Sequence, residues 1–130
     1  MLNTELTKLF SLRYPIVLAP MCWGYTSGDL AAAVTEAGGL GLFGGINVGG
    51  PEWVREQLRV VRSRTDGAFG VGFITWWLPQ FAANFEVCLD ERVPVLAFSF
   101  GDPAPYVARA KEVGALVVCQ VQNRRGRVWR

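Results

Sequence analysis

The side chains that could do chemistry are few in this chain, and their types exclude several enzyme classes. The chain has no histidine, so an imidazole cannot activate a serine or cysteine nucleophile, and the commonest metal ligand is missing. The three cysteines, Cys22, Cys88 and Cys119, are widely spaced and form no CxxC pair. This pattern predicts free thiols rather than a disulfide framework or a zinc site. We therefore assign no catalytic residue and no metal ligand to this chain.

One glycine motif raises the possibility of nucleotide binding. Gly39, Gly41 and Gly44 satisfy the pattern GxGxxG, and Asp66 follows at about the distance of a ribose-binding acidic residue. That fingerprint requires a strand before the glycines and a helix that opens directly from them. Here a helical stretch precedes the glycines, and the next helix waits until Pro51. A dinucleotide-binding domain is therefore the alternative, and glycines that let a strand pack closely under helices are the favoured interpretation.

The elements that must position these residues form one unit that repeats along the chain. Apolar strands alternate with amphipathic helices, which predicts right-handed βαβ units and a parallel sheet in an α/β domain. Ser27 is a plausible N-cap of the first long helix, and Gly38 ends it. The expected strands are 15–19, 39–43, 69–74, 94–98 and 115–119, and the expected helices are 28–37, 51–64, 79–91 and 103–113.

The composition is apolar for a soluble domain. Hydrophobic residues make up 51% and charged residues 18% of the 130 positions, with a mean hydropathy of +0.23, which fits strands that are covered on both faces. No uninterrupted apolar run approaches the roughly 18 residues of a membrane span, and the N-terminus lacks the pattern of a signal peptide. We expect a cytoplasmic protein with no membrane partner.

The last eight residues differ in charge from the rest. Residues 123–130 hold four of the 13 basic residues and none of the 11 acidic ones, so the body of the chain is mildly acidic. A basic tail can bind nucleic acid or an acidic partner. Helical periodicity nevertheless stops where a helix should open after the strand at 115–119. We interpret the segment as a frameshifted or truncated end and expect no nucleic-acid partner.

Two consecutive segments resemble the opening of a known family. Residues 14–21 (YPIVLAPM) read as a strand and a turn, and residues 27–41 (SGDLAAAVTEAGGLG) read as a capped helix that ends at glycine. Together they resemble the nitronate monooxygenases, long called 2-nitropropane dioxygenases, and the resemblance covers about residues 13–122. It implies a partial (β/α)8 TIM barrel of about five parallel strands and four helices. Because a complete barrel takes about 250 residues, we expect residues 1–122 to be the N-terminal part of one.

The resemblance also implies an FMN site at the carboxyl ends of the strands. Pro20 and Met21 would lie against the flavin, and Gln120, after the fifth strand, matches a polar family position near it. Gly72 stands where many members carry an asparagine that contacts the flavin, and a glycine there could allow close backbone approach instead. In the family, the glycine-rich loops that hold the phosphate and an active-site histidine lie beyond residue 122.

A tryptophan pair completes the predicted site. Trp76 and Trp77 follow the third strand and would overhang the rim where barrel active sites lie, as an aromatic wall of a small-substrate pocket. Packing against the next helix is the alternative. By resemblance, the intact enzyme would be an oxidoreductase that oxidises an alkyl nitronate with dioxygen, giving a carbonyl compound and nitrite. We expect the 130-residue chain alone to be inactive.

A function of a different class follows from incomplete closure of a barrel. Half a barrel leaves its first and last strands with unpaired backbone groups, which favour strand addition from another molecule. The chain would then be a non-catalytic half-barrel that self-associates through its open sheet edges as a binding or interaction protein.

Overall fold

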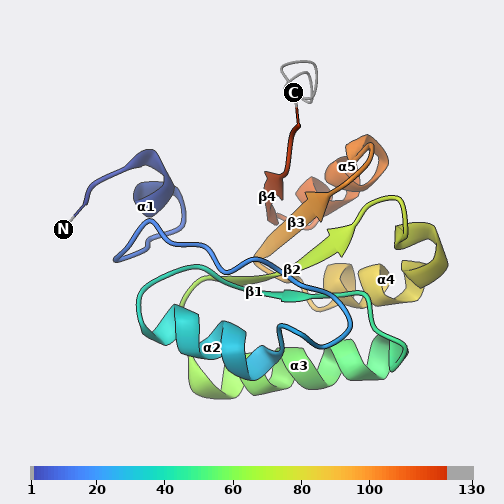
Figure 1. The fold of residues 1–130 in the computed structure, drawn as a ribbon, viewed down its shortest axis with the longest axis horizontal. Coiled ribbons are helices and arrows are strands. Elements are labelled where there is room, and N and C mark those ends of the chain that lie inside the picture. The colour runs from blue at the N-terminus through green and yellow to red at the C-terminus, as the bar shows by residue number, and fades with distance from the viewer. Residues whose placement is uncertain (1, 123–130) are drawn as a thin grey trace.

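The centre of the molecule is a parallel four-stranded sheet. The computed structural model describes residues 2–122, and the sheet has the order β1-β2-β3-β4, so that each strand lies beside its neighbour in the sequence. The strands are β1 (Gly41–Gly44), β2 (Phe69–Ile74), β3 (Val95–Ser99) and β4 (Leu116–Cys119). Sequential parallel strands joined by helices are the architecture of a partial (β/α)8 barrel. The expected fold class is therefore confirmed (Figure 1).

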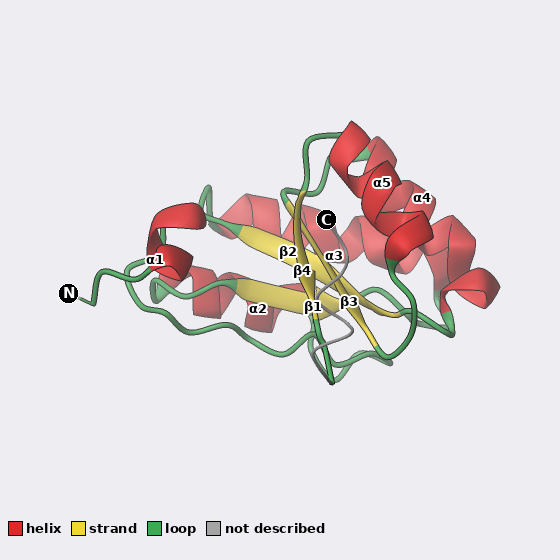
Figure 2. Cartoon of the chain, turned by 90° about the horizontal axis from the view of Figure 1, so that it is seen from above, coloured by secondary structure: helices red, strands yellow, loops and turns green. Residues whose placement is uncertain are grey.

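Two helices precede β1, and the others connect each strand to the next. The helices are α1 (Glu5–Leu9), α2 (Gly28–Glu36), α3 (Gly50–Arg64), α4 (Ala82–Asp90), which follows the short 3-10 helix η1 (Leu78–Phe81), and α5 (Ala104–Glu112). Side chains of α2, α3, α4 and α5 all belong to one apolar cluster on one side of the sheet, and these four helices are seen around the strands in Figure 2. The short helix α1 was not expected from the sequence.

Strand side chains alternate between two faces with different coverings. The face that packs against α2 to α5, here called the outer face, contributes Phe43, Val71, Phe73, Leu96 and Phe98. The opposite, inner face packs against the N-terminal segment in a second cluster of Phe10, Leu12, Leu40, Leu42, Val95 and Ala97. This alternation follows from the two-residue period of a strand. It explains why β1 and β3 read as continuous apolar runs.

The expected strand at 15–19 is reduced to an isolated bridge. In that bridge the Leu18 N–H donates to the Leu40 carbonyl over 3.0 Å, and the pairing is parallel. Prolines at both ends of the segment, Pro15 and Pro20, have no N–H to give to a ladder. The order of the sheet is as expected, but its first member is an extended segment rather than a regular strand.

The start of α2 is capped by a residue that is distant in the sequence. Ser27 occupies the N-cap position, but its hydroxyl makes no capping hydrogen bond. Instead the Gly28 N–H donates to the side-chain carbonyl of Gln57 on α3 over 2.9 Å. Gly28 lies so close to the Gln57 backbone that a side chain would overlap it. The prediction of the cap position was right, and the prediction of the capping group was wrong.

The glycine motif lies within the sheet. Gly41 to Gly44 form β1, and α2 ends before them at Glu36, while α3 begins only at Gly50. No helix opens from the motif in the way a dinucleotide fingerprint requires. The glycines instead permit close packing, because a side chain on Gly41 would overlap the backbone of Ala31 in α2.

Candidate active site

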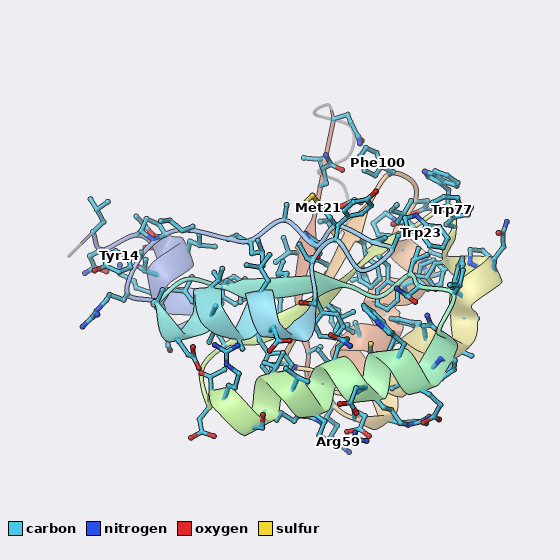
Figure 3. The ribbon with its side chains drawn as sticks, turned by 60° about the horizontal axis from the view of Figure 1, so that its bottom comes forward. Tyr14, Met21, Trp23, Arg59, Trp77 and Phe100 are labelled. Atoms are coloured by element: carbon cyan, nitrogen blue, oxygen red, sulfur yellow. The ribbon has the colours of Figure 1, made fainter. Side chains whose placement is uncertain are left out.

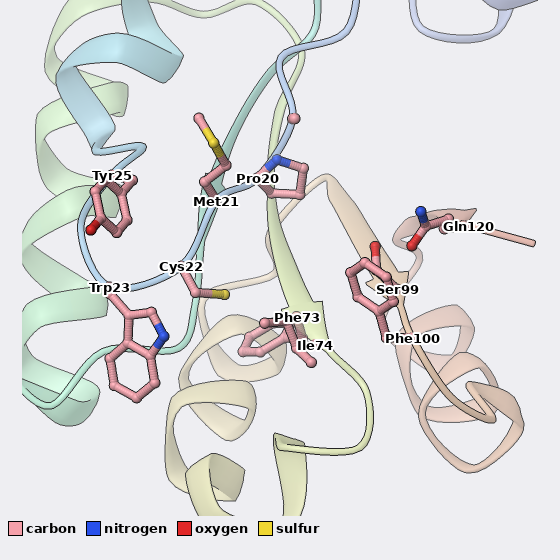
Figure 4. Close-up of a pocket in the computed structure, with 11 residues that line it drawn as sticks. Pro20, Met21, Cys22, Trp23, Tyr25, Phe73, Ile74, Ser99, Phe100 and Gln120 are labelled. Carbon is pink, nitrogen blue, oxygen red and sulfur yellow. The ribbon is translucent and has the colours of Figure 1, made fainter.

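A pocket of about 450 Å³ opens where the strands end at their carboxyl termini. Its walls come from the loop after residues 15–19 and from the ends of β2, β3 and β4 (Figure 4). Figure 3 shows Met21, Trp23 and Phe100 at this end of the molecule, with Tyr14 far from them. The lining residues are Ala19, Pro20, Met21, Cys22, Trp23, Tyr25, Phe73, Ile74, Ser99, Phe100 and Gln120.

Glycines on the inner face let the 20–22 segment lie directly on the sheet. A side chain on Gly72 would overlap the ring of Pro20, and one on Gly44 would come within 2.5 Å of the Cα of Cys22. Gly44 and Gly72 are paired in register between β1 and β2. The space that a larger residue at position 72 would fill is therefore taken by Pro20.

Thr26 fixes the loop that carries Met21. Its buried hydroxyl donates to the Met21 carbonyl over 2.8 Å and accepts from the Gly44 N–H over 3.2 Å. The Thr26 N–H also donates to the Met21 carbonyl, over 3.2 Å. One side chain thus joins the pocket loop to the edge of β1. Sequence reasoning missed Thr26, because its role depends on a turn that places it beside a strand 18 residues away.

Aromatic side chains form the wall on the side of Trp23. The Trp23 indole meets Trp77 edge to face with ring centroids 5.0 Å apart, and meets Phe81 at 5.7 Å. Trp77 in turn packs against Trp76 at 4.7 Å. Trp76 and Trp77 are absent from the pocket lining. Trp77 therefore packs against neighbouring aromatic side chains, which is the alternative interpretation of the pair. Neither tryptophan of the pair lines the pocket, and Trp77 contacts a lining residue, Trp23.

The facing wall carries most of the polar groups of the pocket. Ser99, Phe100 and Gln120 lie together at the ends of β3 and β4 (Figure 4). The Gln120 N–H donates to the Phe98 carbonyl over 2.9 Å, which fixes the start of the segment after β4. Its side-chain amide is exposed at the pocket. A side-chain amide both donates and accepts hydrogen bonds, so it can bond to the N–H and C=O groups at the edge of a heterocyclic ring.

The electrostatics of the pocket are weak. None of the described lining residues carries a formal charge. Burial raises the pKa of the Cys22 thiol, while hydrogen bonds with the backbone of Ile46 and Ile74 oppose that shift. Cys22 is therefore a neutral thiol at physiological pH and a poor nucleophile.

The positions predicted from the sequence thus divide into three groups. Pro20, Met21 and Gln120 meet in the pocket, Gly72 lies beneath Pro20, and the Trp76–Trp77 pair lies outside. Residues 123–130, with the predicted basic tail, fall outside the described part of the chain. Sequence reasoning gave no pocket role to Trp23, Tyr25 or Phe100.

Residues 2–122 offer neither a metal-binding cluster nor a helix that could span a membrane. No three His, Cys, Asp or Glu side chains within the described part of the chain are grouped so that they could hold a metal ion. None of the helices described above has the length and apolarity needed to cross a bilayer.

Comparison with known proteins identifies one family. A sequence model of the family described as nitronate monooxygenase matches residues 3–76. A nitronate monooxygenase of Pseudomonas aeruginosa is 40% identical over 105 residues, which are 80% of this chain and 29% of that protein. A Mycobacterium tuberculosis enzyme named "(3aS,4S,5R,7aS)-5-hydroxy-7a-methyl-1-oxo-octahydro-1H-indene-4-carboxyl-CoA dehydrogenase" is 31% identical over 117 residues, 90% of this chain and 32% of its own length.

A solved structure agrees with these sequence matches. FabK from Thermotoga maritima superposes with a TM-score of 0.86 at 36% identity, covering 95% of this chain and 39% of FabK. The chain therefore spans about a third of the length of the relatives that it matches.

Proposed function

Because the chain belongs to the nitronate monooxygenase family, we propose that residues 1–122 form the first part of an FMN-dependent oxidoreductase barrel that oxidises alkyl nitronates with dioxygen. The observation that carries this proposal is the convergence of Pro20, Met21 and Gln120 in one uncharged pocket at the carboxyl ends of parallel strands. Barrel enzymes place their active sites at that rim.

The pocket fits the ring of a flavin better than its phosphate. Pro20 and Met21 offer an apolar surface on which a flat ring can lie, and the exposed Gln120 amide can pair with a ring N–H or C=O. No arginine or lysine belongs to the described lining of the pocket. We infer that these residues hold the isoalloxazine ring and that the phosphate is bound elsewhere.

The residues of this chain would act by positioning and by excluding water. Bound FMN would take electrons from the nitronate and pass them to dioxygen. Trp23, Phe100 and Ile74 would give an apolar lining to the place where the nitronate reacts, and this lining would favour the loss of water from it. Thr26 holds the Met21 carbonyl and so fixes the surface on which the ring lies. The relatives are named for different substrates, so the nitronate is assigned here as a class.

Flavin titration of the full 130-residue chain tests the proposal. We expect saturable quenching of flavin fluorescence, with riboflavin and FMN binding within about twofold of each other, because none of the described lining residues is a cation that could form an ion pair with a phosphate. Gln120→Ala should weaken both, and Gln80→Ala, an exposed glutamine of η1 outside the pocket, should weaken neither. The absence of saturable binding by either flavin would contradict the proposal.

A second candidate is the self-associating half-barrel. It is favoured by β4, whose four residues are all at least partly exposed, while β1 is buried throughout. Leu116 in β4 and Val121 just after it are 38% and 45% exposed. Light scattering coupled to size exclusion distinguishes the candidates, since a stable dimer without flavin affinity would favour this one.

A further inference from the structure

A second cleft, of about 400 Å³, lies along α3 and reaches the end of α4. It is lined by Arg55, Arg59, Arg62 and Ser63 of α3 and by Glu91, the C-cap residue of α4. Figure 3 shows Arg59 on the side of the molecule away from Met21 and Phe100. The described linings of this cleft and of the flavin pocket have no residue in common, so the two would bind different ligands.

The cleft is positively charged, although the body of the chain is not. Three arginines and one glutamate give its lining an excess of two positive charges, whereas residues 1–122 hold more acidic than basic residues. Residues three and four apart are neighbours on a helix surface, so the three arginines form one row. From Arg55 to Arg62 this row extends about 10 Å along the helix axis. An anion whose charges are spread over a similar length would fit it.

Arg62 is held in place by groups of other elements. Its Nη1 donates to the Glu91 carboxylate over 2.7 Å, and its Nη2 donates to the Glu91 carbonyl over 2.5 Å. The guanidinium also lies 5.9 Å from the centre of the Phe69 ring. A guanidinium has five N–H donors, so donors remain for a ligand. The same contacts neutralise Glu91, and they reduce the side-chain entropy that Arg62 would lose on binding.

Arg55 and Arg59 have exposed partners on their own helix. Arg55 donates to Glu52 over 2.8 Å, and Arg59 donates to Glu56. The two glutamate side chains are 84% and 53% exposed. Because exposed ion pairs contribute little to stability, an anion with more charge than a carboxylate can replace either glutamate. The oxygens of a phosphoryl group match the fork of a guanidinium.

We propose that this cleft binds a small oligophosphate, an anion with two or three linked phosphoryl groups. Linked phosphoryl groups can follow the row of arginines, whereas a single phosphate reaches fewer of them. A long polyanion such as nucleic acid is disfavoured, because Glu52 and Glu56 flank the row and would repel its further phosphates. The proposal is independent of the flavin pocket and of the function proposed for it.

Isothermal titration of the full 130-residue chain with inorganic anions, at constant ionic strength, tests this assignment. Pyrophosphate and tripolyphosphate should bind saturably, and orthophosphate about tenfold more weakly than pyrophosphate, since it loses a charge-assisted contact. Arg59→Gln should weaken pyrophosphate binding by a similar factor, and the Arg59 side chain is 70% exposed, so its loss leaves the core intact. Arg109→Gln is the matched control, because it removes a salt-bridged arginine from α5, outside the cleft. It should change the affinity by less than about twofold.

Glu56→Gln tests the cleft in the opposite direction. It removes the carboxylate that competes for Arg59, so pyrophosphate should bind about two- to threefold more tightly. Thermal unfolding establishes that each variant is folded. The absence of saturable pyrophosphate binding, equal binding of orthophosphate, or weaker binding by Glu56→Gln would overturn the proposal.

An unchanged affinity in Arg59→Gln would also overturn it, since the anion would then bind elsewhere, for example to the arginines of residues 123–130. A single-stranded 12-nucleotide DNA serves as the competing probe. Weaker binding of this DNA than of tripolyphosphate is expected. Tighter binding of the DNA that is lost in Arg59→Gln would identify the cleft as a nucleic-acid site instead.

Discussion

The outer face of the sheet carries large side chains, whereas the inner face of the same sheet carries small ones. At the carboxyl ends of the strands, the outer face presents Phe43, Phe73 and Phe98, each no more than 2% exposed. The inner face presents Gly44, Gly72 and Ala97, which lie side by side in register. Large residues fill the space under the helices, and small ones leave room for the pocket loop. Stability and ligand binding should therefore respond differently to changes on the two faces.

The largest effect is expected on the outer face. Phe85 of α4 is 1% exposed and its ring lies 5.6 Å from Phe73, 6.0 Å from Phe98 and 5.5 Å from Tyr106. Phe85→Ala should lower the free energy of unfolding by about 3–5 kcal/mol, because it removes these contacts and leaves a cavity. Urea denaturation measures the loss, and Phe85→Leu provides a milder variant that remains folded. A loss below about 1 kcal/mol for the alanine variant would contradict the role given to this face.

A smaller loss of stability with a complete loss of flavin binding is expected on the inner face. Gly72→Asn places a side chain where the Pro20 ring lies and should cost about 1–3 kcal/mol through overpacking. Displacement of Pro20 should abolish the quenching of flavin fluorescence. Gly114→Asn is the control, because Gly114 has a φ of +83° and open space around it, which asparagine tolerates. Stronger flavin binding by Gly72→Asn would show that Pro20 does not form the surface for the ring.

Thr26 offers a test of how the loop that carries Met21 is held against β1. Thr26→Val removes a buried hydroxyl that bonds the Met21 carbonyl and the Gly44 N–H, leaving both without that partner, and should cost about 1–3 kcal/mol. Thr26→Ser keeps the hydroxyl and should recover most of this stability. Flavin affinity should follow the same order. Equal stability of the valine and serine variants would mean that the hydroxyl does not hold the loop.

The smallest effect is expected at the exposed surface of α4 and α5. The Arg109 guanidinium donates two hydrogen bonds to Glu86 and lowers the pKa of that carboxyl, with partial burial opposing the shift. A lowered pKa in the folded state stabilises it above the unfolded pKa of about 4.3, and the benefit disappears as the pH falls through the folded pKa. Both side chains are nearly half exposed, so the pair contributes less than about 1 kcal/mol.

Glu86→Gln tests this pair. Its deficit in unfolding free energy should be present near neutral pH and should vanish only as the pH falls below the lowered pKa of folded Glu86, where the carboxyl is protonated in both states. A deficit that stays constant over the whole range would assign the effect to packing instead of charge.

Most of the fold and part of the site could be predicted from the sequence. Strands such as 69–74 were placed correctly because runs of buried apolar residues between helices leave few other arrangements. The reduction of 15–19 to a bridge was not foreseen, since it depends on which backbone groups find partners across the sheet. Pro20, Met21 and Gln120 do come together, and their contact with a flavin stays a prediction. Trp23 was missed because local propensity does not encode a left-handed tryptophan.

The hydroxyl of Thr26 has a consequence for how amide protons exchange with solvent. It occupies the position where a neighbouring strand would accept from the Gly44 N–H, so this amide should exchange slowly although its strand borders only an isolated bridge. In β4, alternate amides point to the side of the sheet opposite β3, and these should exchange quickly. A strand supplied by any other polypeptide would slow the amides of β4 and leave Gly44 unchanged. Deuterium uptake at these two places therefore reports, in one measurement, whether the sheet has gained a neighbour.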